Sequence, residues 1–189
     1  KDMKASKPDL DGAKKLLAEA GYPNGFSLVL ATPNDRYVND AMIAQAVAQM
    51  LTRAGLKVSL DAMTQSQFFP RRNKRDFGIW LAGWGSDTGE MASPLKALIA
   101  TPNRDKGMGP SNAGGYSNPK VDALLEQALA TVDDGKRAAL LAEASRTAMA
   151  DYGALPLHFE MTTWAFRKDL AYLPRLDQAT QATLVKRAP

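Results

Sequence analysis

Residues 26–62 contain a strand, a helix and a second strand in succession, and this order constrains the fold more than any other feature. The first predicted strand, "FSLVLAT" (26–32), is rich in strand-forming residues and precedes a Pro-Asn-Asp turn. The second is "LKVSLDA" (56–62). Strands joined through a helix lie parallel, with a right-handed crossover. The sequence therefore predicts an α/β fold built on a parallel sheet.

The helix between these strands is predicted from apolar residues that recur three and four positions apart and stop before Gly55. A second crossover helix is predicted over 64–75, bent at Pro70, and it leads into a third strand at 77–83. The segment "LAGWGSDTGE" (81–90) therefore lies at the carboxyl end of a predicted central strand, where ligands of open α/β sheets usually bind. The apolar stripe predicted for the first helix is Val38, Met42, Ile43, Ala46, Val47, Met50, Leu51 and Ala54.

Two further helices carry clear start signals. Asp9 and Asn118 each stand directly before a helical pattern, where a side-chain oxygen can accept a hydrogen bond from a backbone N–H of the first turn. The remaining predicted elements are helices at 93–100 and 135–151, a strand at 154–160 and a final strand that lacks a partner within the chain.

Composition excludes several kinds of site. The chain has 189 residues, of which 45% are hydrophobic and 23% charged, as in an ordinary globular domain. It has no cysteine and one histidine, so neither a disulfide nor a thiolate or multi-histidine metal centre is predicted, and no cofactor is expected. No apolar run approaches the roughly 18 residues of a membrane helix. The net charge of +4 is a weak signal for an anionic partner.

The acidic residues of segment 81–90 raise a catalytic alternative, in which Asp87 and Glu90 act as the acid and base of a hydrolase. Catalytic carboxylates normally lie on rigid positions across a substrate, whereas these two share one loop. The single histidine, His158, is predicted as a partly buried strand residue and is far in sequence from Ser86, so no nucleophile and base couple is visible. We therefore predict no catalytic residue.

Two other kinds of binding site have weaker support. Gly83, Gly85 and Gly89 are spaced one residue too far apart for a dinucleotide fingerprint, and the lysine of a phosphate loop is missing. The four basic residues within 71–75 follow two phenylalanines, which suits a nucleic-acid-binding module, but the pattern is also typical of the solvated face of a helix.

Binding without chemistry accounts for segment 81–90 more directly. Trp84 offers a flat apolar wall, and Gly83 and Gly85 leave backbone groups accessible to an extended ligand. The carboxylate of Asp87, three residues after the tryptophan, can accept a charge-assisted hydrogen bond from an ammonium group. On local features alone, this ligand platform and a plain surface turn with a structural tryptophan remain about equally supported.

Five motifs occur in an order that resembles a known class of receptors. They are "DLDGAKKLLAEAGYPNG", Gly-Trp-x-x-Asp at 83–87, "GGYSNPKVDALLEQA", "DDGKRAALLAEASRTAMADYGALPLHF" and "WAFRKDLAYLPR". Together they resemble the carboxyl-terminal lobe of extracellular solute-binding proteins of the peptide/nickel class of ABC importers, known as solute-binding protein family 5. The likeness covers nearly the whole chain.

The resemblance implies a lobe of the type II periplasmic-binding-protein fold, with a mixed, mostly parallel sheet flanked by helices. Residues 1–175 would form this lobe, and 176–189 a tail that returns to a missing amino-terminal lobe. The whole receptor would be a periplasmic, non-catalytic protein that passes a peptide or a related amine-bearing solute to a membrane permease. The ligand-binding residues implied are Gly83, Trp84, Gly85, Ser86 and Asp87. The class also carries nickel chelates, haem, opines and sugars, and the sequence does not select among them.

Overall fold

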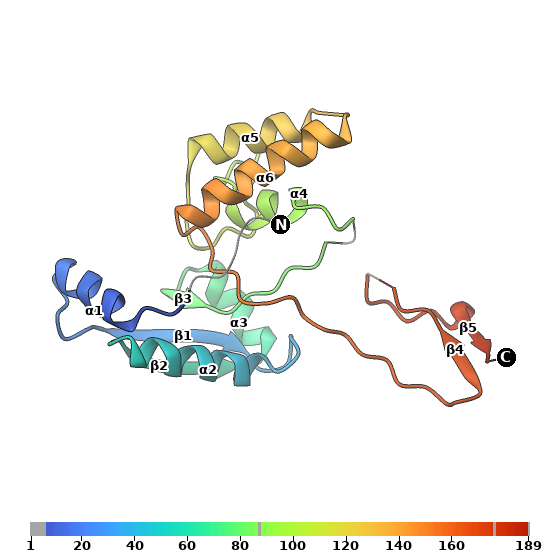
Figure 1. The fold of residues 1–189 in the computed structure, drawn as a ribbon, viewed down its shortest axis with the longest axis horizontal. Helices are drawn as coiled ribbons and strands as arrows, with labels where there is room; N and C mark the ends of the chain where they lie inside the picture. The colour runs from blue at the N-terminus through green and yellow to red at the C-terminus, as the bar shows by residue number, and fades with distance from the viewer. Residues whose placement is uncertain (1–6, 87, 176, 189) are drawn as a thin grey trace. The chain divides into compact units, whose positions relative to one another are not determined.

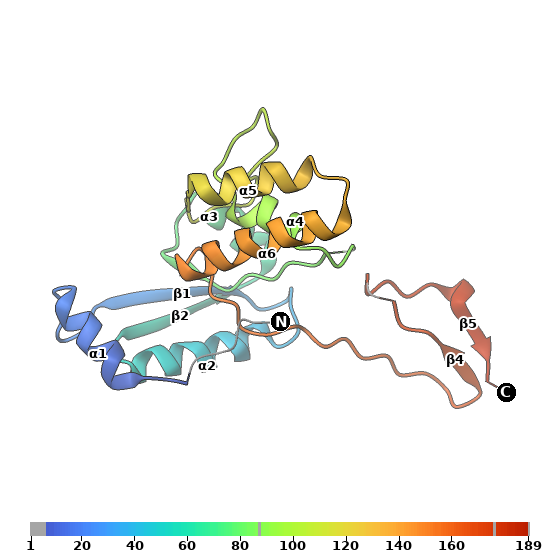
Figure 2. The same cartoon turned by 45° about the horizontal axis from the view of Figure 1, so that its top comes forward.

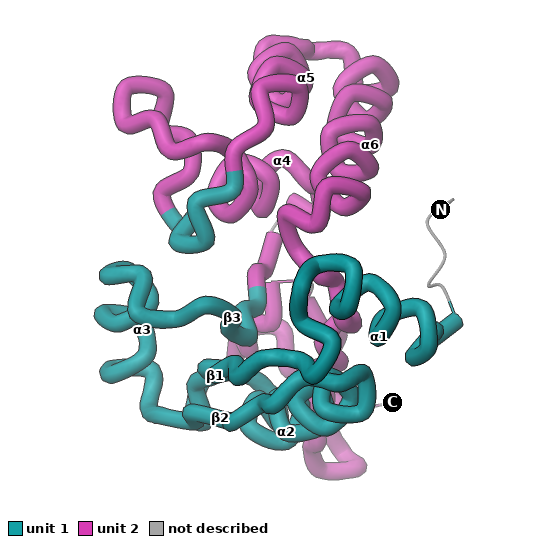
Figure 3. Tube along the Cα trace, turned by 90° about the vertical axis from the view of Figure 1, so that its left-hand side faces the viewer, with its two compact units in different colours: residues 1–83, 111–116 teal, residues 84–110, 117–189 magenta. Residues whose placement is uncertain are grey.

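The computed structural model describes residues 7–86, 88–175 and 177–188. The chain divides into two compact units (Figure 3), one formed by residues 1–83 and 111–116 and the other by 84–110 and 117–189. Every helix among the described residues is too short or too polar to cross a membrane. The predicted division into a lobe at 1–175 and a tail at 176–189 stays a prediction.

The first unit is built on a parallel sheet (Figure 1). Strand β1 (Ser27–Pro33) pairs in parallel with β2 (Lys57–Met63) along its whole length and with β3 (Ile79–Trp80) on its other side. The predicted α/β class and the parallel crossover are thus confirmed. The third strand is shorter than the predicted 77–83, and the order β2-β1-β3 makes β1 central and leaves β3 at an edge of the described sheet.

Three helices belong to this unit: α1 (Leu10–Glu19), α2 (Asp40–Arg53) and α3 (Gln65–Asn73). Helix α1 begins as predicted, with the carboxylate of Asp9 accepting a 2.8 Å hydrogen bond from the backbone N–H of Gly12. Helix α3 includes Pro70, within the predicted range. The buried carboxylate of Asp40 accepts hydrogen bonds from the backbone N–H groups of Arg36 and Tyr37, both 3.0 Å long, and so fixes the turn before α2.

The core of this unit lies on both faces of β1. Leu30 packs with Ala44 and Ala48 of α2, which runs beside β1 and β2 (Figure 2). On the other face, Ala31 packs in a cluster with the fully buried Phe68, whose ring stacks on that of Phe77 with 5.7 Å between centroids. Because both faces are covered, consecutive residues of β1 are buried instead of alternating.

The apolar stripe predicted for α2 is partly wrong. Met42 and Met50 are 70% and 55% exposed, whereas Ala44 and Ala48, which the stripe omitted, are buried with Leu30. Val47, which the stripe included, packs against the same cluster. Alanine allows a helix to approach a sheet closely because it has only a Cβ, whereas a methionine at the same position would hold the two apart.

The second unit contains a helical hairpin. Helix α4 (Ala92–Pro94) continues into the π-helix η1 (Leu95–Ile99), and α5 (Pro119–Leu129) packs against α6 (Asp134–Ala150). Helix α5 begins as predicted, because the side chain of Asn118 accepts hydrogen bonds from two backbone N–H groups of the first turn. The buried residues of the hairpin are Val121, Leu125, Ala128, Leu141, Ala144, Ser145 and Ala148.

An arginine at the start of α6 gathers two carboxylates in this unit. The Nε of Arg137 lies 2.6 Å from Oε1 of Glu90, and its Nη2 lies 2.6 Å from Oδ1 of Asp134. Its Nη1 donates to the carbonyl of Thr131, at 3.1 Å. The hydrogen bond to Glu90, and then that to Asp134, raises the pKa of Arg137 above its ordinary value. The guanidinium therefore ties Glu90 to the turn between α5 and α6.

Two predictions for the carboxyl-terminal residues are wrong. Residues 154–160 form no strand, and His158 is exposed instead of partly buried, because none of the strands among the described residues pairs with this segment. The final strand does have a partner within the chain: β5 (Val185–Arg187), which follows the short helix η2 (Ala182–Leu184), pairs antiparallel with β4 (Leu170–Tyr172).

We expect Phe68→Ala to lower the free energy of unfolding by about 3–5 kcal/mol, since it removes a fully buried ring and leaves a cavity beside Phe77. Met42→Ala, at a position 70% exposed, is the control and should change the free energy by less than about 0.5 kcal/mol. Urea unfolding followed by circular dichroism measures both. Equal effects of the two substitutions would contradict the described core.

We expect Arg137→Met to lower the midpoint of thermal unfolding, because it removes the cation from the partly buried carboxylate of Glu90 and the hydrogen bond to the carbonyl of Thr131. Glu90→Gln should have a smaller effect, since the amide oxygen still accepts from Arg137. Arg146→Met, at an exposed position of the same helix, is the control. Scanning calorimetry gives the three midpoints. If Arg137→Met has the same unfolding midpoint as Arg146→Met, the ion-pair cluster does not stabilise the unit.

Candidate ligand-binding segment

Segment 81–90 begins at the end of β3, so the predicted strand end is confirmed, but β3 lies at an edge of the described sheet instead of its centre. The backbone N–H of Leu81 donates a 2.9 Å hydrogen bond to the carbonyl of Ala31, so the parallel pairing with β1 continues just past β3. Gly83 is the last residue of this stretch in the first unit, and Trp84 is the first residue of the second unit. Asp87, the predicted partner of a ligand ammonium group, lies outside the described residues.

Gly83 is placed against an aromatic ring. Its carbonyl accepts a long, 3.5 Å hydrogen bond from the hydroxyl of Tyr37. A Cβ at this position would lie 2.8 Å from the ring atom Cε1 of Tyr37, closer than carbon atoms approach in folded proteins. Only glycine fits here without displacing the ring, so Gly83 is required for close packing whatever its role in ligand binding.

The side chain of Trp84 is partly exposed, and a hydrogen bond holds its ring. Its side chain is 44% exposed, and its indole Nε1 donates a 3.0 Å hydrogen bond to Oγ of Ser93. The sequence predicted the exposed tryptophan but gave no sign of Ser93, which is nine residues further along and lies within α4. The ring is therefore available to a ligand while one edge is already held.

Gly85 has open surroundings, whereas the side chain of Ser86 is hydrogen-bonded within the loop. A Cβ at Gly85 would meet no described atom within 4 Å, so its backbone groups are approachable. The hydroxyl of Ser86 instead donates to the carbonyl of Glu90, at 2.9 Å. The backbone carbonyl of Ser86 accepts a hydrogen bond from the N–H of Gly89. Gly89 has a φ of +68°, which favours glycine, and it closes a tight turn. The side chain of Ser86 is thus used inside the loop.

Glu90 does not have the surroundings of a catalytic acid. Its carboxylate is already engaged in an ion pair, because the Nε of Arg137 lies 2.6 Å from its Oε1. The pair joins residues 47 positions apart, which no local pattern indicates. Within the described parts of the chain, no three acidic or histidine side chains gather as they would around a metal ion.

The basic residues of α3 also have partners inside the unit. Arg71 lies 3.0 Å from the carboxylate of Asp61 and 3.8 Å from that of Asp76, and its guanidinium sits over the ring of Phe77 at 4.6 Å. Phe68 is buried in the core, as the interpretation of this cluster as a helix face predicted. These contacts favour a helix surface over a platform for nucleic acid.

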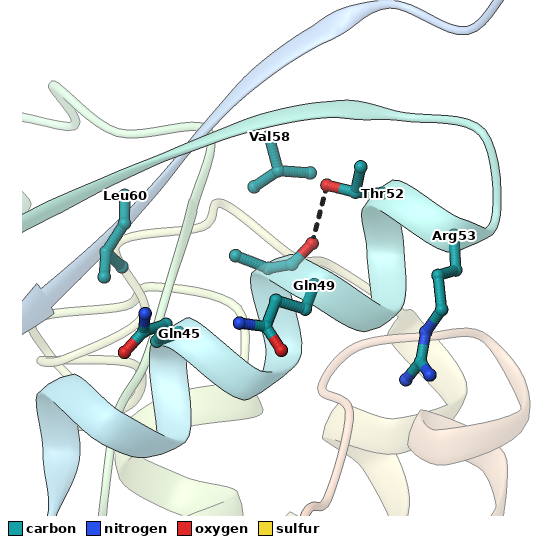
Figure 4. Close-up of a pocket in the computed structure, with 7 residues that line it drawn as sticks. Gln45, Gln49, Thr52, Arg53, Val58 and Leu60 are labelled. Carbon is teal, nitrogen blue, oxygen red and sulfur yellow. Dashed lines mark hydrogen bonds between the residues drawn. The ribbon is translucent and has the colours of Figure 1, made fainter.

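A surface groove of about 440 Å³ lies elsewhere in the first unit, between α2 and β2 (Figure 4). Polar side chains project into it from α2, while Val58 and Leu60 line it from β2. The α2 residues that line it are Gln45, Ala48, Gln49, Thr52 and Arg53. None of the described residues of segment 81–90 belongs to its lining.

The chain matches a known protein family and is similar to members of it. Residues 1–106 match the family described as bacterial extracellular solute-binding proteins, family 5 Middle. The chain is 31% identical, over 163 residues, to the glutathione-binding protein GsiB of Escherichia coli K12, a match that covers 84% of this chain and 31% of that protein. Our chain thus spans about a third of the length of this relative.

Solved structures show the same fold. The ABC transporter-associated periplasmic binding protein DppA from Helicobacter pylori, in complex with the peptide STSA, matches with a TM-score of 0.68 and 26% identity, covering 80% of this chain and 29% of that one. A dipeptide-binding protein from Pseudoalteromonas sp. SM9913, in complex with Met-Leu, matches with a TM-score of 0.78 and 24% identity, covering 95% and 36%. The latter likeness bears on the fold alone.

These matches confirm the type II periplasmic-binding-protein fold that the sequence predicted. They also confirm the expectation of a non-catalytic protein, since the matched family consists of solute-binding proteins and not of enzymes. The family match covers more than half of the chain, including β1, β2, β3 and the candidate segment. The chain belongs to the bacterial extracellular solute-binding proteins of family 5.

Proposed function

We propose that this chain is the ligand-binding carboxyl-terminal lobe of a periplasmic receptor that delivers short peptides, or related amine-bearing solutes, to the permease of an ABC importer. The observation that carries the proposal is the agreement among relatives at 26–31% identity: one is a glutathione-binding protein, and another was solved with the peptide STSA. Both ligands are short peptides, and both carry charged groups that a binding site must match.

Segment 83–87 is the proposed ligand site of this lobe. The exposed face of Trp84 supplies an apolar wall, and the open surroundings of Gly85 leave its backbone groups free to pair with an extended peptide. Gly83 and Ser86 contribute their backbone N–H groups in this proposal, because the carbonyl of Gly83 accepts from Tyr37, the carbonyl of Ser86 accepts from Gly89 and the Ser86 hydroxyl donates to Glu90. These contacts would fix the shape of the site and the register of the bound peptide, but they supply no charged group.

Asp87 supplies the charge in this proposal. An ammonium group of the ligand donates to its carboxylate in a charge-assisted hydrogen bond, which is stronger than a neutral one. A second lobe that closes over the ligand removes water from the site and lowers the local dielectric, so the attraction between the ammonium group and Asp87 increases. The lobe alone has only part of these contacts, and the closed receptor holds the ligand until it meets the permease.

Asp87→Asn in the full-length protein should weaken the binding of glutathione by about 1–3 kcal/mol, because a neutral amide replaces the carboxylate that receives the ammonium group. Isothermal titration calorimetry measures the change. Asp105→Asn, on an exposed loop, is the control substitution and should bind like the wild type.

N-acetylated glutathione, which lacks the ammonium group, provides a matched control ligand. It should bind the wild type and Asp87→Asn with the same affinity. If Asp87→Asn binds glutathione as tightly as the wild type does, Asp87 is a residue of a solvated turn and not part of the site. If neither glutathione nor a panel of di-, tri- and tetrapeptides binds the wild type, the proposed peptide function is wrong.

A further inference from the structure

We infer that Ser93 is a positioning residue for ligand binding: it holds the indole ring of Trp84 in place and leaves only the apolar surface of that ring to the ligand. The inference rests on the proposed function, since it assigns a role to a residue that supports the proposed site. Its basis is the 3.0 Å hydrogen bond from Nε1 of Trp84 to Oγ of Ser93.

The helical segment that contains Ser93 is anchored in its unit. Ser93 lies in α4, which runs directly into η1, and the backbone N–H of Leu95 donates to the carbonyl of Met91 across this start. Leu95 and Ile99 of η1 are 1% and 5% exposed, so the helical segment is anchored in the core of its unit. The backbone of Ser93 is therefore held close to that core, while its hydroxyl lies at the surface beside Trp84.

The backbone that carries Trp84 offers the ring little support of its own. Both of its neighbours, Gly83 and Gly85, lack side chains that would restrict the ring, and nothing described lies within 4 Å of a Cβ at Gly85. An exposed side chain in such a setting samples several rotamers, and ordering it on binding lowers affinity. The hydrogen bond to Ser93 orders the indole before the ligand arrives.

The same hydrogen bond also limits the chemistry of the ligand group at this position. Indole has a single N–H donor and no acceptor, and in Trp84 this donor is already used by Ser93. The ring then offers its carbon edge and its π-face, which favour an apolar side chain or a cation over a hydrogen-bond acceptor. The site should accordingly discriminate little between ligands that differ only by an acceptor at this position.

The contact itself is tested in the 189-residue chain by ¹⁵N-labelled NMR of the indole N–H groups of Trp80, Trp84 and Trp164, with Trp84→Phe to assign the signal. We expect Ser93→Ala to increase exchange of the Trp84 indole proton with water about 2–10-fold, as the loss of one neutral hydrogen bond implies. Ser93→Thr retains the hydroxyl and should restore the slow exchange. Ser59→Ala, at an exposed position on β2, is the control.

The role in binding is tested with glutathione and the full-length protein by calorimetry and stopped-flow fluorescence. Ser93→Ala should raise the Kd about 2–10-fold, mainly through faster dissociation, and Ser93→Thr should return it to the wild-type value. An unchanged indole exchange rate, or an unchanged Kd in Ser93→Ala, overturns the inference. If no peptide binds the wild type, the proposed function and the binding role of Ser93 both fail, whereas the exchange measurement still decides whether the contact exists.

Discussion

Strand β1 is paired on both edges and its residues 30–33 are buried, and the start of the candidate ligand segment, up to Gly83, depends on this arrangement. Its parallel pairing with β2 and β3 aligns the carboxyl ends of the three strands. The hydrogen bond from Leu81 to Ala31 extends that alignment to the residues just before Gly83. Ligands of α/β proteins bind at such strand ends because the chain leaves the sheet there and its backbone groups become free to pair.

Beyond Gly83 the segment is held by side chains instead of by strand pairing. Glu90 is tied to Arg137, and the ring of Trp84 is tied to Ser93, both within the second unit. Between these two fixed points Gly85 stays open. Glu90 therefore secures the loop, while the exposed ring of Trp84 is the surface that we propose contacts the ligand. Glu90, a candidate acid on sequence grounds, is therefore a structural residue.

Features with a local or periodic cause could be predicted from the sequence. The strand, helix, strand order of 26–62 and the capping residues Asp9 and Asn118 depend on neighbours in the chain, and the structure has them where the pattern indicates. Periodicity alone was insufficient for the stripe of α2, where Ala44 and Ala48 are buried and Met42 and Met50 are exposed. Residues 154–160 have a strand-like composition but form no strand. The pairs of Glu90 with Arg137 and of Gly83 with Tyr37 could not be predicted, because they join residues more than 40 positions apart.

A crystal structure of the full-length protein with a bound peptide tests the central claim most directly, namely that segment 83–87 is the ligand site. Our account predicts that the ligand lies against the face of Trp84, that its ammonium group contacts Asp87, and that the indole N–H remains bonded to Ser93. A peptide bound away from Trp84 and Asp87, for example in the groove between α2 and β2, would contradict it.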